Sequence, residues 1–137
     1  MTAPDTWSVA VPFAKVASEQ RLVFGWASII SDESGAQLIF DHHGTMIPVS
    51  ELESAAYEYV VTSREMGDMH EAVGVGHLIE SCVLTPEKRT AMGIDPVGPI
   101  GWWVGFRVTD DGVWARIKSG DISAFSIGGD AVKEPVA

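Results

Sequence analysis

One segment of this chain has a clear helical pattern, and most of the rest resembles β-strands. Between Ser50 and Gly67 the apolar residues recur three and four positions apart, as they do on one face of a helix. Ser50 followed by Glu53 has the spacing of a capping box, which predicts that the helix begins at Ser50 and ends near Gly67. One long helix among strand segments is typical of the α+β class.

Segments rich in β-branched and aromatic residues predict the strands. They are residues 7–16, 21–30, 36–40, a strand around His70, a longer strand that ends at Leu84, and residues 100–108 and 122–129. These segments are separated by short turn clusters, so neighbouring strands are expected to pair antiparallel. We therefore predict about six or seven strands in a mostly antiparallel sheet or small barrel.

Two shorter helices are predicted between the strands. Thr85 and Pro86 are the residue types preferred at an N-cap and at the first helical position, and Gly93 lies near the expected end. Residues 110–120 place an apolar face on a second short helix that ends at Gly120. The predicted architecture is one long and two short helices around the sheet.

Length and composition indicate a single folded domain. The 137 residues suggest one domain, residues 1–137, with its core at about 20–130 and flexible ends. Hydrophobic residues make up 46% of the chain, enough for a sizeable core. The single cysteine, Cys82, allows no internal disulfide. The first residues do not resemble a signal peptide, and no apolar run approaches the roughly 20 residues of a membrane span, so we expect a cytosolic protein.

The acidic balance of the chain argues against two classes of partner. Nineteen acidic residues face nine basic ones, which gives a formal net charge of −10. Nucleic-acid binding usually leaves a basic patch, and anionic lipid attracts basic segments. We therefore expect no nucleic-acid partner and no membrane partner.

The sequence contains no pattern for a metal or a phosphate cofactor. His42 and His43 are adjacent, so on a strand they would point to opposite faces, and they match no zinc-ligand spacing. Residues 74–76, Gly-Val-Gly, lack the spacing and the lysine of a phosphate-binding loop. We predict no cofactor.

Nucleophilic catalysis is the chemistry that the residues support best. Ser126 stands in the segment AFSIGG, where Gly128 and Gly129 would let a substrate approach the backbone. A serine hydroxyl needs a base within hydrogen-bond reach, and His70 is the candidate. The alternative is a small polar residue in an ordinary strand.

Glu80 is the third informative residue. Strict alternation in GHLIESCVL would put Glu80 on the same face as Leu78 and Cys82, and His77 on the opposite face. A carboxylate on an apolar face is costly unless it is paired. Glu80 could orient a histidine as the acid of a catalytic triad does. Alternatively, it could pair with Arg107, Arg116 or Lys118, or simply face solvent. His77 is the second-choice imidazole.

The order of these motifs resembles a known family. RLVFGWASI, MHE, GHLIES, GWWVGFRV and VWARIKSGDISAFSIGG follow one another as in the XkdF-type phage serine proteases. That family is related to the prohead (capsid-maturation) proteases of tailed phages and to the herpesvirus assemblins. The resemblance covers about residues 20–130, and its most specific part is the block that ends in Phe125-Ser126-Ile127-Gly128-Gly129.

The resemblance implies a fold, a site and a role. The fold is a small, mostly antiparallel β-barrel flanked by helices, as in assemblins. The family's serine matches Ser126 and its histidine matches His70, and Glu80 is our choice for the third group, with His77 as the rival. The implied activity is a serine endopeptidase that cleaves phage scaffold and major capsid protein segments inside the immature capsid in the bacterial cytoplasm. A homo-oligomer is possible. The alternative is a catalytically inactive structural or peptide-binding protein of the same fold.

Overall fold

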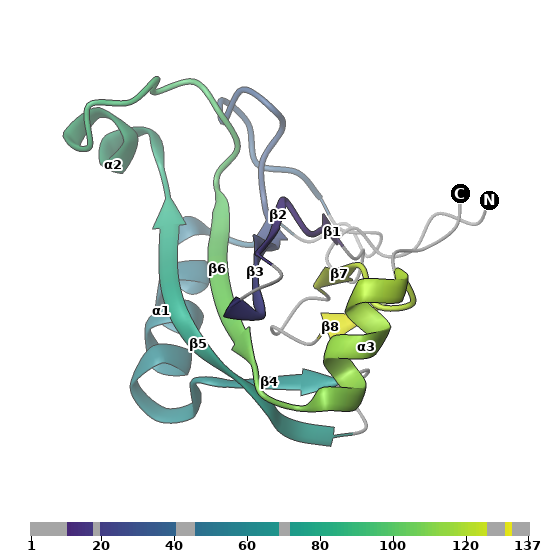
Figure 1. The fold of residues 1–137 in the computed structure, drawn as a ribbon. Coiled ribbons are helices and arrows are strands. Elements are labelled where there is room, and N and C mark those ends of the chain that lie inside the picture. Colours follow the sequence, from purple (N-terminus) through teal and green to yellow (C-terminus); the bar gives the residue numbers. More distant parts are fainter. Residues whose placement is uncertain (1–10, 18–19, 41–45, 69–71, 126–130, 133–137) are drawn as a thin grey trace.

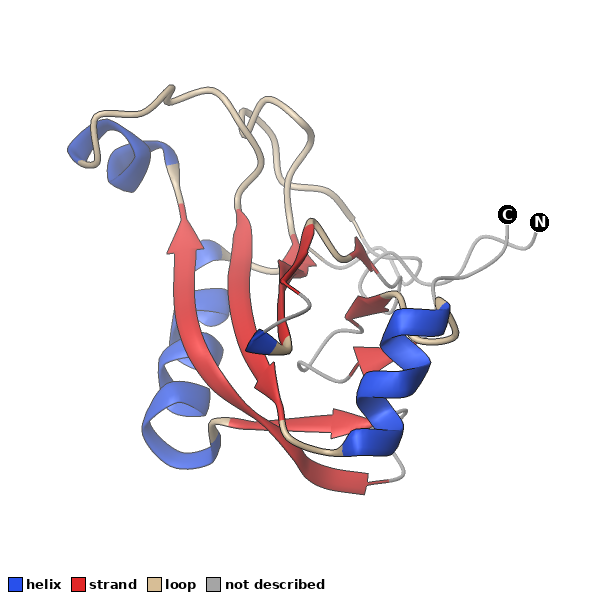
Figure 2. Cartoon of the chain, viewed as in Figure 1, coloured by secondary structure: helices blue, strands red, loops and turns tan. Residues whose placement is uncertain are grey.

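A long antiparallel pair of strands, β5 and β6, forms the centre of the sheet (Figures 1 and 2). The computed structural model describes residues 11–17, 20–40, 46–68, 72–125 and 131–132. The central strands are β5 (Ala72–Leu84), β6 (Gly101–Val108), β3 (Leu22–Ile29) and β2 (Lys15–Ala17), and each pairs antiparallel with the next. Valine, isoleucine and aromatic residues dominate these segments, which is why they prefer the pleated backbone.

The outer strands are shorter. They are β1 (Val11–Pro12), β4 (Glu65–Asp68), β7 (Ala124–Phe125) and β8 (Ala131–Val132). The strand order is β1-β7-β8-β4-β5-β6-β3-β2, and β8 runs parallel to β4 while the other neighbours are antiparallel. The predicted α+β class is therefore confirmed.

The predicted closed barrel of six or seven strands is not formed, because the sheet is open among the described strands. Strands β1 and β2 stand at opposite ends of the order, and no ladder joins them. The residues between them already use their backbone donors. The Phe13 N–H binds Ser123 O at 2.8 Å, and the Ala14 N–H binds Phe24 O at 2.7 Å. Phe13 and Ala14 thus bind the chain before β7 and strand β3, and β1 and β2 form no ladder with each other.

Helix α1 (Val49–Glu58) begins earlier than the sequence predicts. Its N-cap is Pro48 in the extended conformation, and the Leu52 N–H donates to Pro48 O at 3.1 Å. The capping box of Ser50 with Glu53 is therefore wrong, because the fixed backbone angle of Pro48 suits the entry to a helix. The helix continues into a π-helical turn, η2 (Tyr59–Ser63), and stops at Arg64 in the left-handed conformation.

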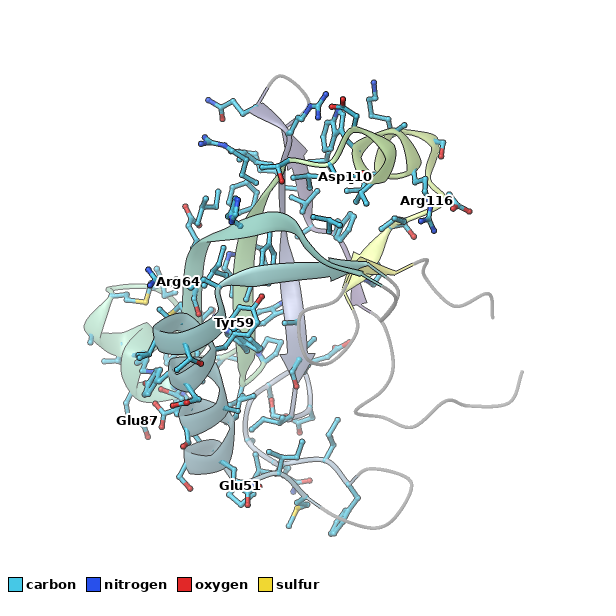
Figure 3. The ribbon with its side chains drawn as sticks, turned by 90° about the horizontal axis from the view of Figure 1, so that it is seen from below. Glu51, Tyr59, Arg64, Glu87, Asp110 and Arg116 are labelled. Atoms are coloured by element: carbon cyan, nitrogen blue, oxygen red, sulfur yellow. The ribbon has the colours of Figure 1, made fainter. Side chains whose placement is uncertain are left out.

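The two short helices are confirmed, and so are Thr85 as the N-cap of the first and Gly120 as the end of the second. In α2 (Pro86–Ala91) the Lys88 N–H donates to Thr85 Oγ1 at 3.2 Å. In α3 (Asp111–Ser119) the Val113 N–H donates to Asp110 Oδ1 at 2.9 Å, and Gly120 ends the helix with a φ of 84°. Figure 3 shows Asp110 where β6 leads into α3. The strand predicted at 36–40 is wrong, since its residues form only isolated bridges, such as Ser31 with Leu38.

The core lies on one face of the central strands. Val23, Val104, Phe106 and Val108 are almost completely buried there. Tyr59, labelled in Figure 3, closes this face from the end of α1, with its ring 5.3 Å from that of Trp102 and 6.4 Å from that of Phe106. The apolar face of α3 adds Val113, Trp114 and Ile117, as the sequence predicts. No helix of the described residues is both long and apolar enough to cross a membrane.

Candidate functional site

The two residues predicted for catalysis, Ser126 and His70, lie outside the described residues, but the strands beside them are described. Phe125, the residue before Ser126, pairs with Ala131 between β7 and β8. Ala131 pairs in turn with Asp68, two residues before His70, between β8 and β4. Strands β7 and β8, which are close in the sequence, therefore meet the distant strand β4 in one row of the sheet.

This row places the approaches to the two predicted groups close together. Neighbouring strands lie about 4.8 Å apart, so two strand spacings, or about 10 Å, separate the backbones of Phe125 and Asp68. Fifty-seven positions separate the same residues along the chain. A serine and a histidine can form a catalytic pair only if the fold joins their segments in this way. We call the row Phe125–Ala131–Asp68 the candidate site row.

The end of α3 fixes the chain that leads into β7. The Gly120 N–H donates to Ile117 O at 3.1 Å, and the Ile122 N–H donates to Arg116 O at 3.0 Å, so the carbonyls at the helix end are satisfied. Arg116 Nε also bonds Asp121 Oδ2 at 3.0 Å, and Figure 3 shows Arg116 at this end of the helix. Ile122 is fully buried and anchors the segment in the core.

A similar arrangement fixes the chain that leads into β4. The Arg64 N–H donates to Tyr59 O at 2.9 Å, which closes the π-helical turn. The Leu78 N–H donates to Arg64 O at 2.9 Å, which ties the start of β4 to β5. Tyr59 and Arg64 lie side by side at this junction in Figure 3. The path toward Asp68 is thus held by hydrogen bonds on the sheet side and on the helix side.

A β-bulge changes the predicted faces of Glu80 and His77. Leu78 pairs with the buried Phe106, whereas Glu80 pairs with Gly105, so Ile79 is an extra residue in β5. Leu78 packs against the core, and the exposed Glu80 points to the opposite face. We call this the uncovered face, because the buried residues of the described helices pack into the core on the other side. His77 pairs with the exposed Arg107, which lies on the same face as Gly105. The predicted alternation is therefore wrong, because the bulge shifts its phase by one residue.

The register also separates Glu80 from the candidate site row. Ala72 of β5 is the partner of Asp68. From Ala72 to Glu80 the pairing advances by five positions, once the extra residues at the β-bulges are left out. At about 3.3 Å for each step, this distance is about 17 Å. It exceeds the combined reach of two side chains, which argues against Glu80 as the direct partner of a group at the row. The assignment of Glu80 as a catalytic residue stays a prediction, and so does that of His77.

The shifted pKa values of the described residues belong to other parts of the surface. Glu53 accepts hydrogen bonds from Lys88 Nζ and from the Tyr57 hydroxyl, both at 2.9 Å, and these bonds lower its pKa. Burial lowers the pKa of Lys88, but its hydrogen bonds to Tyr57 and Glu53 outweigh burial and raise it. The Ser34 hydroxyl, 2.8 Å away, lowers the pKa of Asp32. These groups stabilise the link between α1 and α2 and a turn after β3.

Within the described part of the chain, no three histidine, cysteine or acidic side chains are grouped so that they could hold a metal ion. His42 and His43, which match no zinc-ligand spacing in the sequence, lie outside that part.

Comparison with known proteins agrees with the resemblance found in the sequence. Two curated proteins of Bacillus subtilis (strain 168) are each 30% identical to this chain. One is the uncharacterized protein YqbD, over 129 residues, and the other is the phage-like element PBSX protein XkdF, over 122 residues. The alignments cover 93% and 86% of this chain, but only 37% and 41% of those proteins.

No solved structure matches the chain significantly. The family model described as "Putative phage serine protease XkdF" matches residues 10–134. Because that match spans nearly the whole chain, the protein belongs to the XkdF family of phage proteins.

Proposed function

We propose that this chain is a serine endopeptidase that matures phage heads, with Ser126 as the nucleophile and His70 as its base. The observation that carries the proposal is the candidate site row, since Phe125 and Asp68 are the described residues beside the two groups. Membership of the XkdF family supports the same reading. The scissile bond is a peptide bond, and no cofactor takes part.

The mechanism is acyl transfer. The His70 imidazole accepts the proton of the Ser126 hydroxyl while its oxygen attacks the peptide carbonyl carbon. The tetrahedral intermediate collapses to an acyl-enzyme when the imidazolium returns the proton to the leaving amine. Water, activated by the same imidazole, then releases the second product. General-base catalysis of this kind contributes about 100- to 10,000-fold to the rate.

The third catalytic group is the least defined part of the proposal. The sequence favours Glu80 first and His77 second, and both lie on the uncovered face of β5. Because about 17 Å separates Glu80 from the candidate site row, we propose Ser126 and His70 as the catalytic pair without a direct role for Glu80. Separate kcat measurements for Glu80→Gln and His77→Gln decide which residue, if either, orients the imidazole.

The proposed substrates are phage scaffold and major capsid protein segments, cleaved inside the prohead in the cytoplasm of the host bacterium. The chain spans about two fifths of the length of its curated relatives. Cleavage is therefore a proposal for this domain, and further partners, including further copies of the chain, are proposals as well. The rival function is an inactive structural or peptide-binding component of the same fold.

The test combines two variants with a covalent probe. A fluorophosphonate should label the wild-type chain and should label neither Ser126→Ala nor His70→Ala. Co-expression with scaffold and capsid proteins should give cleavage products with the wild-type chain alone. The Ser126→Ala/His70→Ala double variant should be no less active than either single variant, because groups that act as one unit lose their effect together. Continued cleavage by folded Ser126→Ala would refute the nucleophile assignment.

A further inference from the structure

Four residues from four neighbouring strands stand in one row on the uncovered face of the sheet. Lys15 of β2 pairs with Phe24 of β3, Phe24 pairs with Gly105 of β6, and Gly105 pairs with Glu80 of β5. Directly paired residues point to the same side of a sheet. The row therefore runs from a cation, across an aromatic ring and a glycine, to a carboxylate. We call it the Lys15–Glu80 row.

The glycine in the middle of this row makes room for the Phe24 ring. A Cβ atom at Gly105 would lie 2.7 Å from two atoms of the Phe24 ring and 3.4 Å from Glu80 Cβ. The Phe24 ring therefore lies partly over the bare backbone of Gly105. Beside the ring lies a shallow pocket with a volume of about 260 Å³, lined by Lys15, Phe24, Glu80 and Trp103, which we call the hollow. That space can accept one amino-acid side chain.

The face that carries the hollow is not covered by α1, which packs on the other side of the central strands. In Figure 1 α1 lies behind β5, and it contacts both β5 and β6. The uncovered face nevertheless carries three aromatic residues that are only half-buried, Phe24, Trp26 and Trp103. The rings of Trp26 and Trp103 meet edge to face at 5.4 Å and form a firm wall beside the hollow. Contiguous apolar surface that stays partly exposed is typical of binding sites.

The charges at the two ends define the ligand that fits. Lys15 Nζ lies 5.7 Å from the centre of the Phe24 ring, so the ammonium group is held at one rim. Glu80 stands at the other rim, and no ion pair between the two is found among the described residues. The rims together are neutral, with three N–H donors on Lys15 and carboxylate acceptors on Glu80. A neutral group with an acceptor at one end and a donor at the other matches both.

We propose that the hollow of the Lys15–Glu80 row binds a glutamine or asparagine side chain of an extended peptide. The carbonyl oxygen of the amide accepts a hydrogen bond from Lys15, its NH₂ donates to Glu80, and its stem lies between Phe24 and Trp103. A glutamate would meet Glu80 with like charge, a lysine would meet Lys15 in the same way, and a leucine would leave both rims unpaired. The inference rests on the proposed function in that the bound peptide is the substrate.

The binding test uses four peptides that differ in one residue. They are acetyl-Ala-Ala-X-Ala-Ala-amide with X as Gln, Glu, Lys or Leu, so that the backbone amides are the same in all. Each is titrated into the ¹⁵N-labelled Ser126→Ala chain, which binds without cleaving. The readout is the indole N–H resonance of Trp103, assigned with Trp103→Phe. We expect saturable shifts with the Gln peptide and at least fivefold weaker binding of the other three.

Matched variants test whether the two rims produce this preference. Lys15→Met and Glu80→Met should each reduce the Gln preference to less than twofold. The control variants Lys118→Met and Glu58→Met change exposed residues on α3 and α1 and should keep it. All four positions are exposed, so the fold should tolerate each change.

Several results would overturn the inference. These are equal binding of the four peptides, a preference for Glu or Lys, and shifts that spare Trp103. A Trp103 shift that depends only on protein concentration and disappears in Lys15→Glu would identify the face as a contact between copies of the chain. The tests of peptide binding and of cleavage can fail independently. If the Gln peptide binds but the wild-type chain cleaves nothing, the proposed function is refuted and this inference stands. If the wild-type chain cleaves but shows no Gln preference, this inference is refuted and the proposed function stands.

Discussion

Gly105→Ala should destabilise the protein because of one specific neighbour. The new methyl group would lie 2.7 Å from two atoms of the Phe24 ring, which is too close for carbon atoms. Overpacking of this kind costs about 1–3 kcal/mol, and the half-buried ring can swing outward, so we take about 1.5–2 kcal/mol. Alanine in a strand regains about 0.5–1 kcal/mol relative to glycine. The net loss in the free energy of unfolding is then about 1 kcal/mol.

The same reasoning predicts a change of sign when the ring is absent. In the Phe24→Ala background there is nothing for the methyl group to displace, so Gly105→Ala should stabilise by about 0.5 kcal/mol. Gly101→Ala is the matched comparison. Its methyl group would clash with the backbone oxygen of Ser28 and would lie 3.2 Å from the Cα atom of Ile29. Backbone cannot swing away, so that variant should lose about 3 kcal/mol or more.

Urea unfolding followed by tryptophan fluorescence measures all of these differences, provided that the m-values agree between variants. The decisive quantity is the effect of Gly105→Ala in the two backgrounds. If it has the same sign and size with and without Phe24, the ring does not lie over Gly105. The position of the Phe24 ring at the wall of the hollow would then be wrong.

Three further predictions follow from other parts of the structure. Asp110→Ala should lower the free energy of unfolding by about 1 kcal/mol through loss of the N-cap of α3, whereas Asp110→Asn, which keeps a cap acceptor, should lose less, as thermal unfolding will show. The pKa of Glu53 is lowered in the folded chain, so its stabilising effect is present above its unfolded pKa and is lost as the pH falls through the folded value. The free energies of unfolding of wild type and Glu53→Gln, measured in urea, should therefore differ by a small amount at pH 7, and the difference should vanish toward pH 3. Glu80→Gln should raise KM for glutamine-containing peptides and change kcat by only a few-fold, whereas a kcat loss near that of His70→Ala would make Glu80 the third catalytic group.

The elements that could be predicted from the sequence are those whose signals are local. Two adjacent residues, Thr85 and Pro86, specify the start of α2. Asp110 caps the start of α3, and Gly120 ends it. The strands β3 and β6 are equally direct, because both segments are rich in β-branched and aromatic residues. The start of α1 is local too, but Pro48 competes with Ser50 for the cap, and the rigid proline backbone prevails.

The features that could not be predicted depend on pairing between distant strands. The bulge at Ile79 exists only relative to β6, so no pattern within GHLIES reveals that Glu80 leaves the apolar face. Barrel closure depends on whether β1 and β2 meet, which is a property of the sheet as a whole. The position of the hollow depends on the register of three strand pairs. Gly105 in the aromatic-rich strand is nevertheless a visible sign, since glycine weakens a strand unless something must approach it closely.

The two rows on the sheet set a distance that a substrate must satisfy. The candidate site row and the Lys15–Glu80 row are about 17 Å apart along β5, the length of about five residues of extended peptide. If Ser126 and His70 cleave at the first row and the second row holds an amide side chain, the preferred glutamine should lie about five residues from the cleaved bond, on one side of it. Moving a single glutamine along a substrate peptide, with products identified by mass spectrometry, should give the highest kcat/KM near that position. Two positions closer or farther, the side chain cannot reach the hollow without displacing the scissile bond, so kcat/KM should fall at least fivefold. A flat dependence on glutamine position would show that the two rows do not hold the same peptide.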